Sequence, residues 1–166
     1  MKCFSICFVL VVWFSVFCTF SSMAQDASDQ PLLIGRTSFR SLSARPYFDW
    51  FGSGYDGYQP NPSAIEFIKS RSSGIRVLIF GATWCSDTRA NLPSFIKVLD
   101  LSGIQRKRVD LYFTDRDKHT PEGLENQYGI MRVPTFIVLR NGLELGRITE
   151  SASTTLEGDL ADILSK

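Results

Sequence analysis

Cysteine and histidine are both scarce in this chain of 166 residues. Three of the four cysteines lie within the first 18 residues, and His119 is the one histidine. Structural zinc sites take four ligands, mostly from these two residue types. His119 stands in a polar segment without other metal-ligating company, and we find no zinc, phosphate-loop or Ser-His-Asp pattern. The sequence therefore predicts neither a metal site nor a bound cofactor.

A surplus of charge of one sign is also lacking. The chain has 18 Lys and Arg against 17 Asp and Glu, and they are scattered along it. The one basic cluster, Arg106-Lys107-Arg108, is interpreted as a solvated turn, because a nucleic-acid surface needs a broad basic face. We therefore do not expect nucleic acid as a partner.

The first 24 residues have the pattern of an export signal. Lys2 gives a basic start, residues 4–20 are almost continuously apolar, and Ser22 and Ala24 are small residues before a cleavage point. The apolar run is somewhat short for a membrane span, which needs roughly 20 residues. We predict cleavage after Ala24, with an uncleaved anchor as the alternative. The mature protein is then exported, periplasmic or secreted, with no membrane span left.

Removal of this segment takes away Cys3, Cys7 and Cys18 and leaves Cys85 as the single thiol. Exported proteins usually pair their cysteines, so a single one indicates either a reactive thiol or a buried inert one. The remaining length fits one domain with one core. We divide the chain into the signal over residues 1–24, an aromatic-rich N-terminal extension over 25–60 and a domain over 61–166. The aromatic side chains are expected to anchor the extension to the domain, and the rim of a partner groove is the alternative.

From residue 61 onward, strand and helix patterns alternate. Residues 75–80 and 109–113 are mostly apolar, with Arg76 and Asp110 as the exceptions, and both are interpreted as buried strands. Asn141-Gly142 is a strong two-residue hairpin signal between residues 136–139 and 143–148. This order predicts a mixed sheet with helices on both faces. Four helices are predicted: one capped by Asn61 and ending near Gly74, one from Cys85 to Ser102 with Leu92, Phe95, Ile96 and Leu99 on its apolar face, one from Thr120 to Tyr128, and one opened by a capping box over Thr154–Glu157.

Cys85 stands where the strand over 75–80 turns into the second of these helices. Unpaired N–H groups and the macrodipole at a helix N-terminus stabilise a thiolate, which is the nucleophilic form of cysteine. Thr88, three residues on, occupies the place of the second cysteine of a redox dithiol. Its hydroxyl is expected to donate to the thiolate, with a plain helix residue as the alternative. The negative charge of Asp87 interacts favourably with the helix dipole, but it repels a thiolate two residues away.

Four features in order and spacing resemble the thioredoxin family from about Ile65 to the C-terminus: Trp84-Cys85, Pro93 eight residues later, the Tyr-Gly-Ile-Met-Arg-Val-Pro-Thr run over 128–135, and Asn141-Gly142. The resemblance implies an α/β, thioredoxin-like fold with a central mixed sheet flanked by helices on both faces. It also implies that Val133 offers its backbone to an extended peptide, that Pro134 is cis beside Cys85, and that Trp84 shields the site.

The departures from the family pattern concern the second thiol. Thr88 replaces the resolving cysteine, and Ile79 replaces the buried aspartate that serves it. A subset of the family with Trp-Cys-x-Asp and a late Gly-Arg-Ile-x-Glu, here residues 146–150, is most similar. By that analogy Glu150 lies near Cys85 and joins Asp87 as an accessory acid.

Two functions follow from this pattern. The leading hypothesis is an exported thiol–disulfide oxidoreductase acting through Cys85 alone. It forms a mixed disulfide with a protein or small-molecule client, and an external thiol resolves that intermediate. The alternative is a non-catalytic module that binds peptides or a partner in the groove of Val133 and Pro134. Peroxidase action is disfavoured, because the proline and threonine that precede a peroxidatic cysteine in that family are missing.

Overall fold

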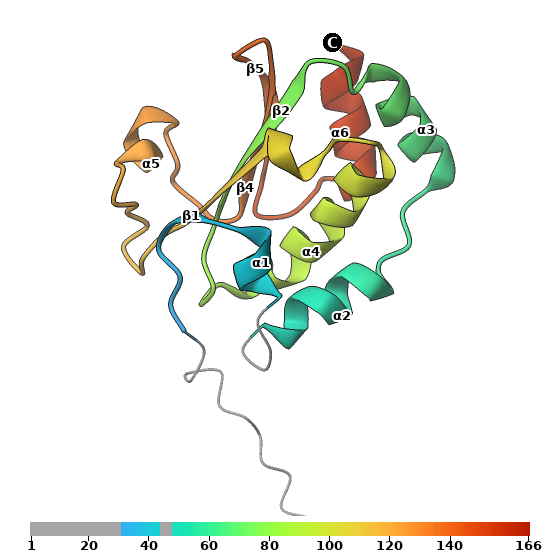
Figure 1. The fold of residues 1–166 in the computed structure, drawn as a ribbon. Coiled ribbons are helices and arrows are strands. Elements are labelled where there is room, and N and C mark those ends of the chain that lie inside the picture. Colours follow the sequence, from blue (N-terminus) through green and yellow to red (C-terminus); the bar gives the residue numbers. More distant parts are fainter. Residues whose placement is uncertain (1–30, 44–47) are drawn as a thin grey trace, which may run out of the picture.

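The computed structural model describes residues 31–43 and 48–166, and the predicted export signal lies outside them. Within those ranges the chain forms a five-stranded sheet with helices around it, in the strand order β1-β3-β2-β4-β5 (Figure 1). No helix in the described ranges is both long and apolar enough to cross a membrane.

The sheet is mixed, as the sequence predicted. β2 runs parallel to β3, whereas the pairs β1–β3, β2–β4 and β4–β5 are antiparallel. At the tip of the β4–β5 hairpin, Asn141 and Gly142 have φ values of 52° and 83°, as a tight hairpin turn of this type requires. The strands are β1 (Gly35–Thr37), β2 (Ile75–Gly81), β3 (Val109–Phe113), β4 (Thr135–Arg140) and β5 (Leu143–Thr149).

The helices cover the two faces of the sheet unequally. Figure 1 shows α5 alone on one side, with α2, α3, α4 and α6 gathered on the other. Helices on both faces are therefore confirmed, and the thioredoxin-like fold class with them. The helices are α1 (Phe39–Leu42), α2 (Asp49–Gly57), α3 (Pro62–Arg71), α4 (Ser86–Leu101), α5 (Leu124–Gln127) and α6 (Leu156–Ser165), with a 3₁₀ turn, η2, over Arg106–Arg108.

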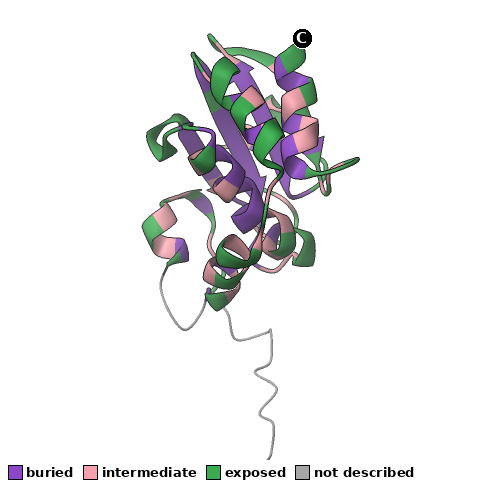
Figure 2. Cartoon of the chain, turned by 90° about the vertical axis from the view of Figure 1, so that its right-hand side faces the viewer, coloured by how far each residue is buried: buried purple, intermediate pink, exposed green. Residues whose placement is uncertain are grey.

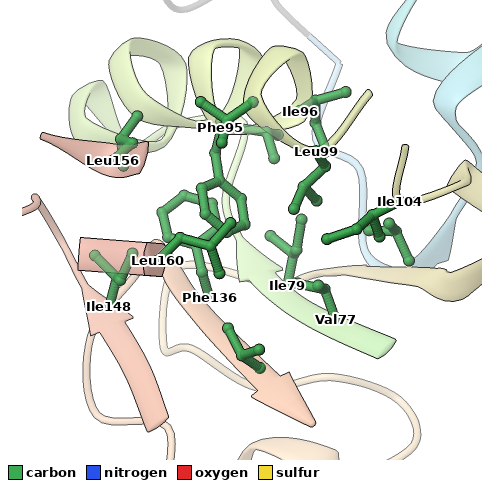
Figure 3. Packing of buried hydrophobic residues seen from close by; sticks show 14 of the residues in the cluster. Val77, Ile79, Phe95, Ile96, Leu99, Ile104, Phe136, Ile148, Leu156 and Leu160 are labelled. Atoms are coloured by element: carbon green, nitrogen blue, oxygen red, sulfur yellow. The ribbon is translucent and has the colours of Figure 1, made fainter. Parts of the chain in front are cut away.

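The larger hydrophobic cluster lies beneath the helix-rich side. Odd-numbered residues of β2 such as Val77 and Ile79 point into it, because successive side chains of a strand alternate between faces. The rings of Phe95 on α4 and Phe136 on β4 lie 4.3 Å apart at its centre (Figure 3). The predicted apolar face of α4 is confirmed, since Leu92, Phe95, Ile96 and Leu99 are all buried.

A smaller cluster occupies the opposite face. Phe80 is fully buried there and stacks on Tyr112 at 5.5 Å between ring centroids. Trp84 and Cys85 pack against this cluster, which has the short α5 as its helical cover. Its buried members are Leu78, Phe80, Ala82, Ile130, Val133, Ile137 and Leu139.

The described part of the N-terminal extension packs onto the helix-rich side. Leu42 and Phe51 belong to the larger cluster. α2 lies against α4 at Pro93, where Gly54 faces the proline ring: a Cβ on Gly54 would lie 2.6 Å from Pro93 Cγ. The central strands β2, β3 and β4 are largely buried, whereas the helices have exposed residues on their outer faces (Figure 2). Aromatic side chains of this segment thus act as anchors to the domain.

Two helix starts differ from the sequence expectation. α5 begins at Leu124 instead of Thr120, because Gly123 takes a left-handed conformation with φ 65°. The capping box over Thr154–Glu157 is wrong: the N-cap of α6 is Thr155, whose Oγ1 accepts from Gly158 N at 3.1 Å. Asp159 instead accepts from Thr154 N, at 3.2 Å.

Glu157 does not cap α6 and instead binds the segment before α3. Its carboxylate accepts from the Tyr58 hydroxyl at 2.6 Å and from Asn61 N at 2.9 Å. Burial acts to raise the pKa of Glu157, but these hydrogen bonds bring it below its ordinary value. Burial and the neighbouring carboxylate raise the pKa of Tyr58 to about 12. The residues before α3 are thereby tied to the last helix.

Candidate active site

Cys85 occupies the N-cap position of α4, directly after the loop that leaves β2. Its backbone is extended, with φ −87° and ψ 124°, and its carbonyl accepts the first helical hydrogen bond from Arg89 N at 3.2 Å. The side chain is partly exposed, and the thiol donates to Val133 O at 3.3 Å. The sulfur therefore stands at the positive end of a 16-residue helix, where a thiolate is stabilised.

Val133 and Pro134 are joined by a cis peptide bond, as the resemblance implied. The Val133 side chain is buried in the smaller cluster. Its carbonyl accepts from Cys85, and no partner for its N–H is found among residues 31–43 and 48–166. One main-chain donor thus remains available beside the sulfur.

Thr88 faces the sheet. Its side chain is fully buried, and its Oγ1 accepts a hydrogen bond from Ala82 N at 3.2 Å. Its methyl group lies 3.0 Å from the place where a Cβ on Gly81 would stand. Contrary to expectation, no hydrogen bond joins the described side chains of Thr88 and Cys85 in this structure. Thr88 therefore fixes the start of α4 against β2.

Trp84 is held by a loop that the sequence did not connect with it. Its Nε1 donates to the backbone oxygen of Asp115 at 3.2 Å, and the ring packs on the smaller cluster beside Cys85. The Asp115 carboxylate in turn accepts from the backbone N–H groups of Asp117 and His119. This turn sets the position of the indole next to the thiol.

The same loop is bound by a buried carboxylate, Glu125 of α5. It accepts from Thr120 Oγ1 at 2.7 Å and Thr120 N at 3.0 Å, and His119 Nδ1 lies 3.3 Å away. The Thr120 hydroxyl, with weaker help from backbone N–H groups and His119, outweighs burial and lowers the pKa of Glu125 to about 2. His119 therefore contacts a buried carboxylate that holds the loop in place, and this contact gives the histidine a structural role.

Glu150 lies at a junction between the cis-proline loop and α4. Its N–H donates to Pro134 O at 2.7 Å, and its carboxylate pairs with Arg132 Nη1 at 2.8 Å. Asn91 Nδ2 donates both to Glu150 O at 3.1 Å and to Asp87 O at 3.0 Å. These bonds bring Glu150 next to Pro134 and the first turn of α4, while Asp87 is exposed.

Sequence reasoning missed three residues of this arrangement: Asn91, Arg132 and Asp115. Arg132 lies inside the motif over 128–135, so the sequence could have predicted that it stands next to Val133 and Pro134. Asn91 and Asp115 gave no signal, because each acts on or through a backbone carbonyl of a distant segment.

A single sulfur is the reactive group that the described site contains. Within residues 31–43 and 48–166, no group of three or more His, Cys, Asp or Glu side chains could hold a metal ion. Ile79, which replaces the buried aspartate of the family pattern, is completely buried in the larger cluster. The arrangement suits nucleophilic attack by sulfur beside an open main-chain donor.

Comparison with known proteins agrees with this geometry. A family model described as "Thioredoxin" matches residues 51–158. A thioredoxin of Coprinus comatus is 30% identical over 93 residues, which cover 55% of this chain and 84% of that protein. Thioredoxin H2-2 of Oryza sativa subsp. japonica is 28% identical over 89 residues, which cover 54% and 62% of the two chains.

A solved structure of a Pseudomonas aeruginosa protein of unknown function shares the fold. It superimposes with a TM-score of 0.58 at 17% identity, covering 78% of this chain and 90% of that one. Because the family match spans more than half of the sequence, this chain belongs to the thioredoxin family, whose function is of the thiol–disulfide oxidoreductase type.

Proposed function

We propose that this protein is an exported thiol–disulfide oxidoreductase that works through Cys85 alone. The observation that supports it best is the partly exposed thiol at the N-cap of α4, 3.3 Å from Val133 O and beside an unpaired Val133 N–H. An extended client that binds this N–H places its sulfur close to Cys85. The export signal predicted over residues 1–24 supports a periplasmic or secreted location.

The reaction begins when the Cys85 thiol gives up its proton to solvent. The thiolate attacks one sulfur of a client disulfide, the client S–S bond breaks, and the second client sulfur leaves as a thiolate. Cys85 is then joined to the client in a mixed disulfide. Loss of the thiol proton also removes the S–H donor from Val133 O, which frees that carbonyl for the client backbone.

An external thiol must complete the cycle. Thr88 occupies the resolving position and has no sulfur, and the described residues hold no other cysteine. A thiolate from a small molecule or a second protein attacks the client sulfur of the mixed disulfide. Cys85 leaves as a thiolate, and the client carries a disulfide to the external thiol.

Trapping of the mixed disulfide tests this proposal. The purified protein is mixed with a peptide that contains one disulfide, and the products are resolved by mass spectrometry. We expect a peptide adduct on Cys85 that disappears on addition of glutathione, and none on Cys85→Ser. An adduct rate equal to that of free cysteine at the same pH would contradict an activated thiol.

A non-catalytic peptide-binding module is the second candidate, favoured by the open N–H of Val133 beside cis-Pro134. On this alternative, Cys85→Ala binds an unmodified peptide as tightly as the natural protein and Cys85 reacts slowly. Peptide binding measured by fluorescence anisotropy, next to alkylation of Cys85 by iodoacetamide across pH, separates the two. Fast alkylation at neutral pH supports the oxidoreductase.

A further inference from the structure

One residue close to the candidate site keeps a backbone conformation that favours glycine. Glu150 directly follows β5 and has a φ of 63°. Ser151 N donates to Thr149 O at 2.8 Å, so residues 149–151 form a γ-turn with a positive φ at its centre, which is the rarer and more strained form. A residue with a side chain keeps such a conformation only where its surroundings fix it, and these positions concentrate at functional sites. The contacts of Glu150 must therefore hold this turn in place.

Two of these contacts are to the residues on either side of Val133 in the sequence. The Glu150 N–H donates to Pro134 O at 2.7 Å, and the Glu150 carboxylate pairs with Arg132 Nη1 at 2.8 Å. The Thr135 hydroxyl adds a hydrogen bond to Arg132 O at 2.7 Å. The main chain that carries the open Val133 N–H is thus fixed both before and after that residue.

Glu150 also connects this loop to the cysteine helix. Asn91 Nδ2 donates to Glu150 O at 3.1 Å and to Asp87 O, in the first turn of α4, at 3.0 Å. Asp87 stands two residues after Cys85 in the sequence. The N–H, the C=O and the side chain of Glu150 therefore each bind a different residue. Together they join the helix that begins at the sulfur to the loop that holds Val133.

Stability alone does not account for a glutamate at this position. The Arg132 and Glu150 side chains are 67% and 38% exposed, and an exposed ion pair contributes little to folding. Glycine would also adopt this backbone conformation without strain. The distance between sulfur and client is a different matter, because a displacement of about 1 Å at a reacting group can cost roughly a hundredfold in rate.

We propose that Glu150 is a positioning residue for thiol–disulfide exchange at Cys85, and that it acts on clients with a peptide backbone. It holds Val133 beside the sulfur, so that the Val133 N–H binds the client main chain while the client sulfur meets Cys85. This inference rests on the proposed function and adds the class of client, a disulfide within an extended peptide. A small disulfide without amide groups does not use the Val133 N–H, so its reaction does not depend on Glu150.

The rates of two disulfides with the natural protein and with Glu150→Gly test this. One is a peptide that contains a disulfide, and the other is 4,4′-dithiodipyridine, which has no peptide group. With each, the Cys85 thiolate attacks one sulfur, the S–S bond breaks, and the other sulfur leaves as a thiolate. We expect Glu150→Gly to slow the peptide reaction about tenfold and to change the dithiodipyridine rate less than about twofold. Its melting temperature should change little, because relief of strain offsets the lost ion pair.

Further variants separate positioning from the loss of any ion pair. Arg132→Gln removes the partner of the carboxylate and should also slow the peptide reaction. The double variant with Glu150→Gly should be no slower than Glu150→Gly alone, because both changes remove one interaction. Glu144→Gln is the matched control, since Glu144 lies on β5, is 33% exposed and pairs with Arg147 at 2.7 Å. It should leave both rates unchanged.

The proposal is overturned if the peptide rate of Glu150→Gly stays within about twofold of the natural rate. Equal slowing of the two disulfides, or equal slowing by Glu144→Gln, overturns it as well. If the natural protein reacts with the peptide no faster than free cysteine does, the proposed function fails instead. Glu150 is then tested by fluorescence anisotropy of a disulfide-free peptide on Cys85→Ser, with and without Glu150→Gly. Binding about tenfold weaker with Glu150→Gly supports the positioning of Val133, and equal binding overturns it.

Discussion

The two faces of the sheet differ in how they are covered and in what they carry. The face beneath α2, α3, α4 and α6 holds the larger cluster, with Phe95 and Phe136 in contact at its centre. The other face holds a smaller cluster under α5 and loops, and Trp84 and Cys85 pack against it. One face thus provides most of the buried apolar area, while the other leaves the sulfur accessible.

The first turn of α4 connects these two environments. Cys85 lies with the smaller cluster and is partly exposed, whereas Thr88 is fully buried against β2. Helical spacing places the two residues next to each other, but solvent reaches the side chain of Cys85 and not that of Thr88. A partly exposed thiol and a buried packing residue are therefore three residues apart.

Thr88→Cys changes this contrast most. It restores a second sulfur three residues after Cys85, in the spacing of a redox dithiol. We expect an internal disulfide under mild oxidation and a gain of insulin reduction with dithiothreitol, where the natural protein is slow. The free energy of unfolding of the reduced variant should fall by about 1 kcal/mol, because Ala82 N loses a strong acceptor.

Thr88→Val is the matched control, since it removes the hydroxyl without adding sulfur. It should lose similar stability and gain no insulin reduction. If Thr88→Cys forms no internal disulfide, the two side chains do not meet at the helix start.

Phe95→Ala tests the helix-rich face. Removal of a fully buried ring from the larger cluster should lower the free energy of unfolding by about 3–5 kcal/mol. Leu124→Ala on the α5 side removes a partly exposed side chain and should cost about 1 kcal/mol. Urea denaturation followed by circular dichroism measures both. Equal losses would mean that the two faces contribute alike.

Tyr58→Phe tests the link between the N-terminal segment and α6. Glu157 stays buried but loses the hydroxyl donor, so we expect a cost of about 1–3 kcal/mol at neutral pH. Tyr55→Phe is the control, because Asp100 keeps its ion pair with Arg106, and its cost should stay near about 0.5–1 kcal/mol. Thermal unfolding of both variants measures the two costs. A larger cost for Tyr58→Phe means that the hydrogen bond to Glu157 matters, whereas equal costs mean that loss of either tyrosine hydroxyl has the same effect.

Acid titration tests the loop that holds Trp84. The pKa of Glu125 is lowered to about 2 in the folded state, so its contribution is complete above its ordinary value of 4.5 and is lost as the pH falls toward 2. Thr120→Val removes the hydroxyl donor and should shift this loss to higher pH. The free energy of unfolding of the natural protein and of Thr120→Val is measured at a series of pH values from 6 to 2, and the pH at which each loses stability is compared. The exposed Glu66→Gln should leave the acid profile unchanged.

The parts of the fold that depend on local pattern were predictable. β2, β3 and α4 followed from apolar runs and helical spacing, and the β4–β5 turn from Asn141-Gly142. β1 was not predicted, because three residues carry no periodicity and the strand exists through pairing with β3. The capping box failed for a related reason: Glu157 bonds Tyr58, 99 residues earlier in the chain.

The candidate site divides in the same way. Cys85, Val133 and Pro134 came from motifs within short stretches, and the structure brings them together. The hydrogen bond from Asn91 to the backbone oxygen of Glu150 joins residues 59 positions apart. Every residue has a backbone oxygen, so the acceptor does not depend on the residue type and no sequence pattern could predict the contact.

The close approach of α2 to α4 has a mechanical consequence. Gly54 leaves space for the Pro93 ring, and one added methyl group there would stand 2.6 Å from Pro93 Cγ, well inside contact distance. Something at this contact must shift when the methyl group is added, and Cys85 is the N-cap of the same helix. The N-terminal segment thus supports the cysteine helix, and a change as small as glycine to alanine, 31 residues before the sulfur in sequence, is felt in the packing of that helix.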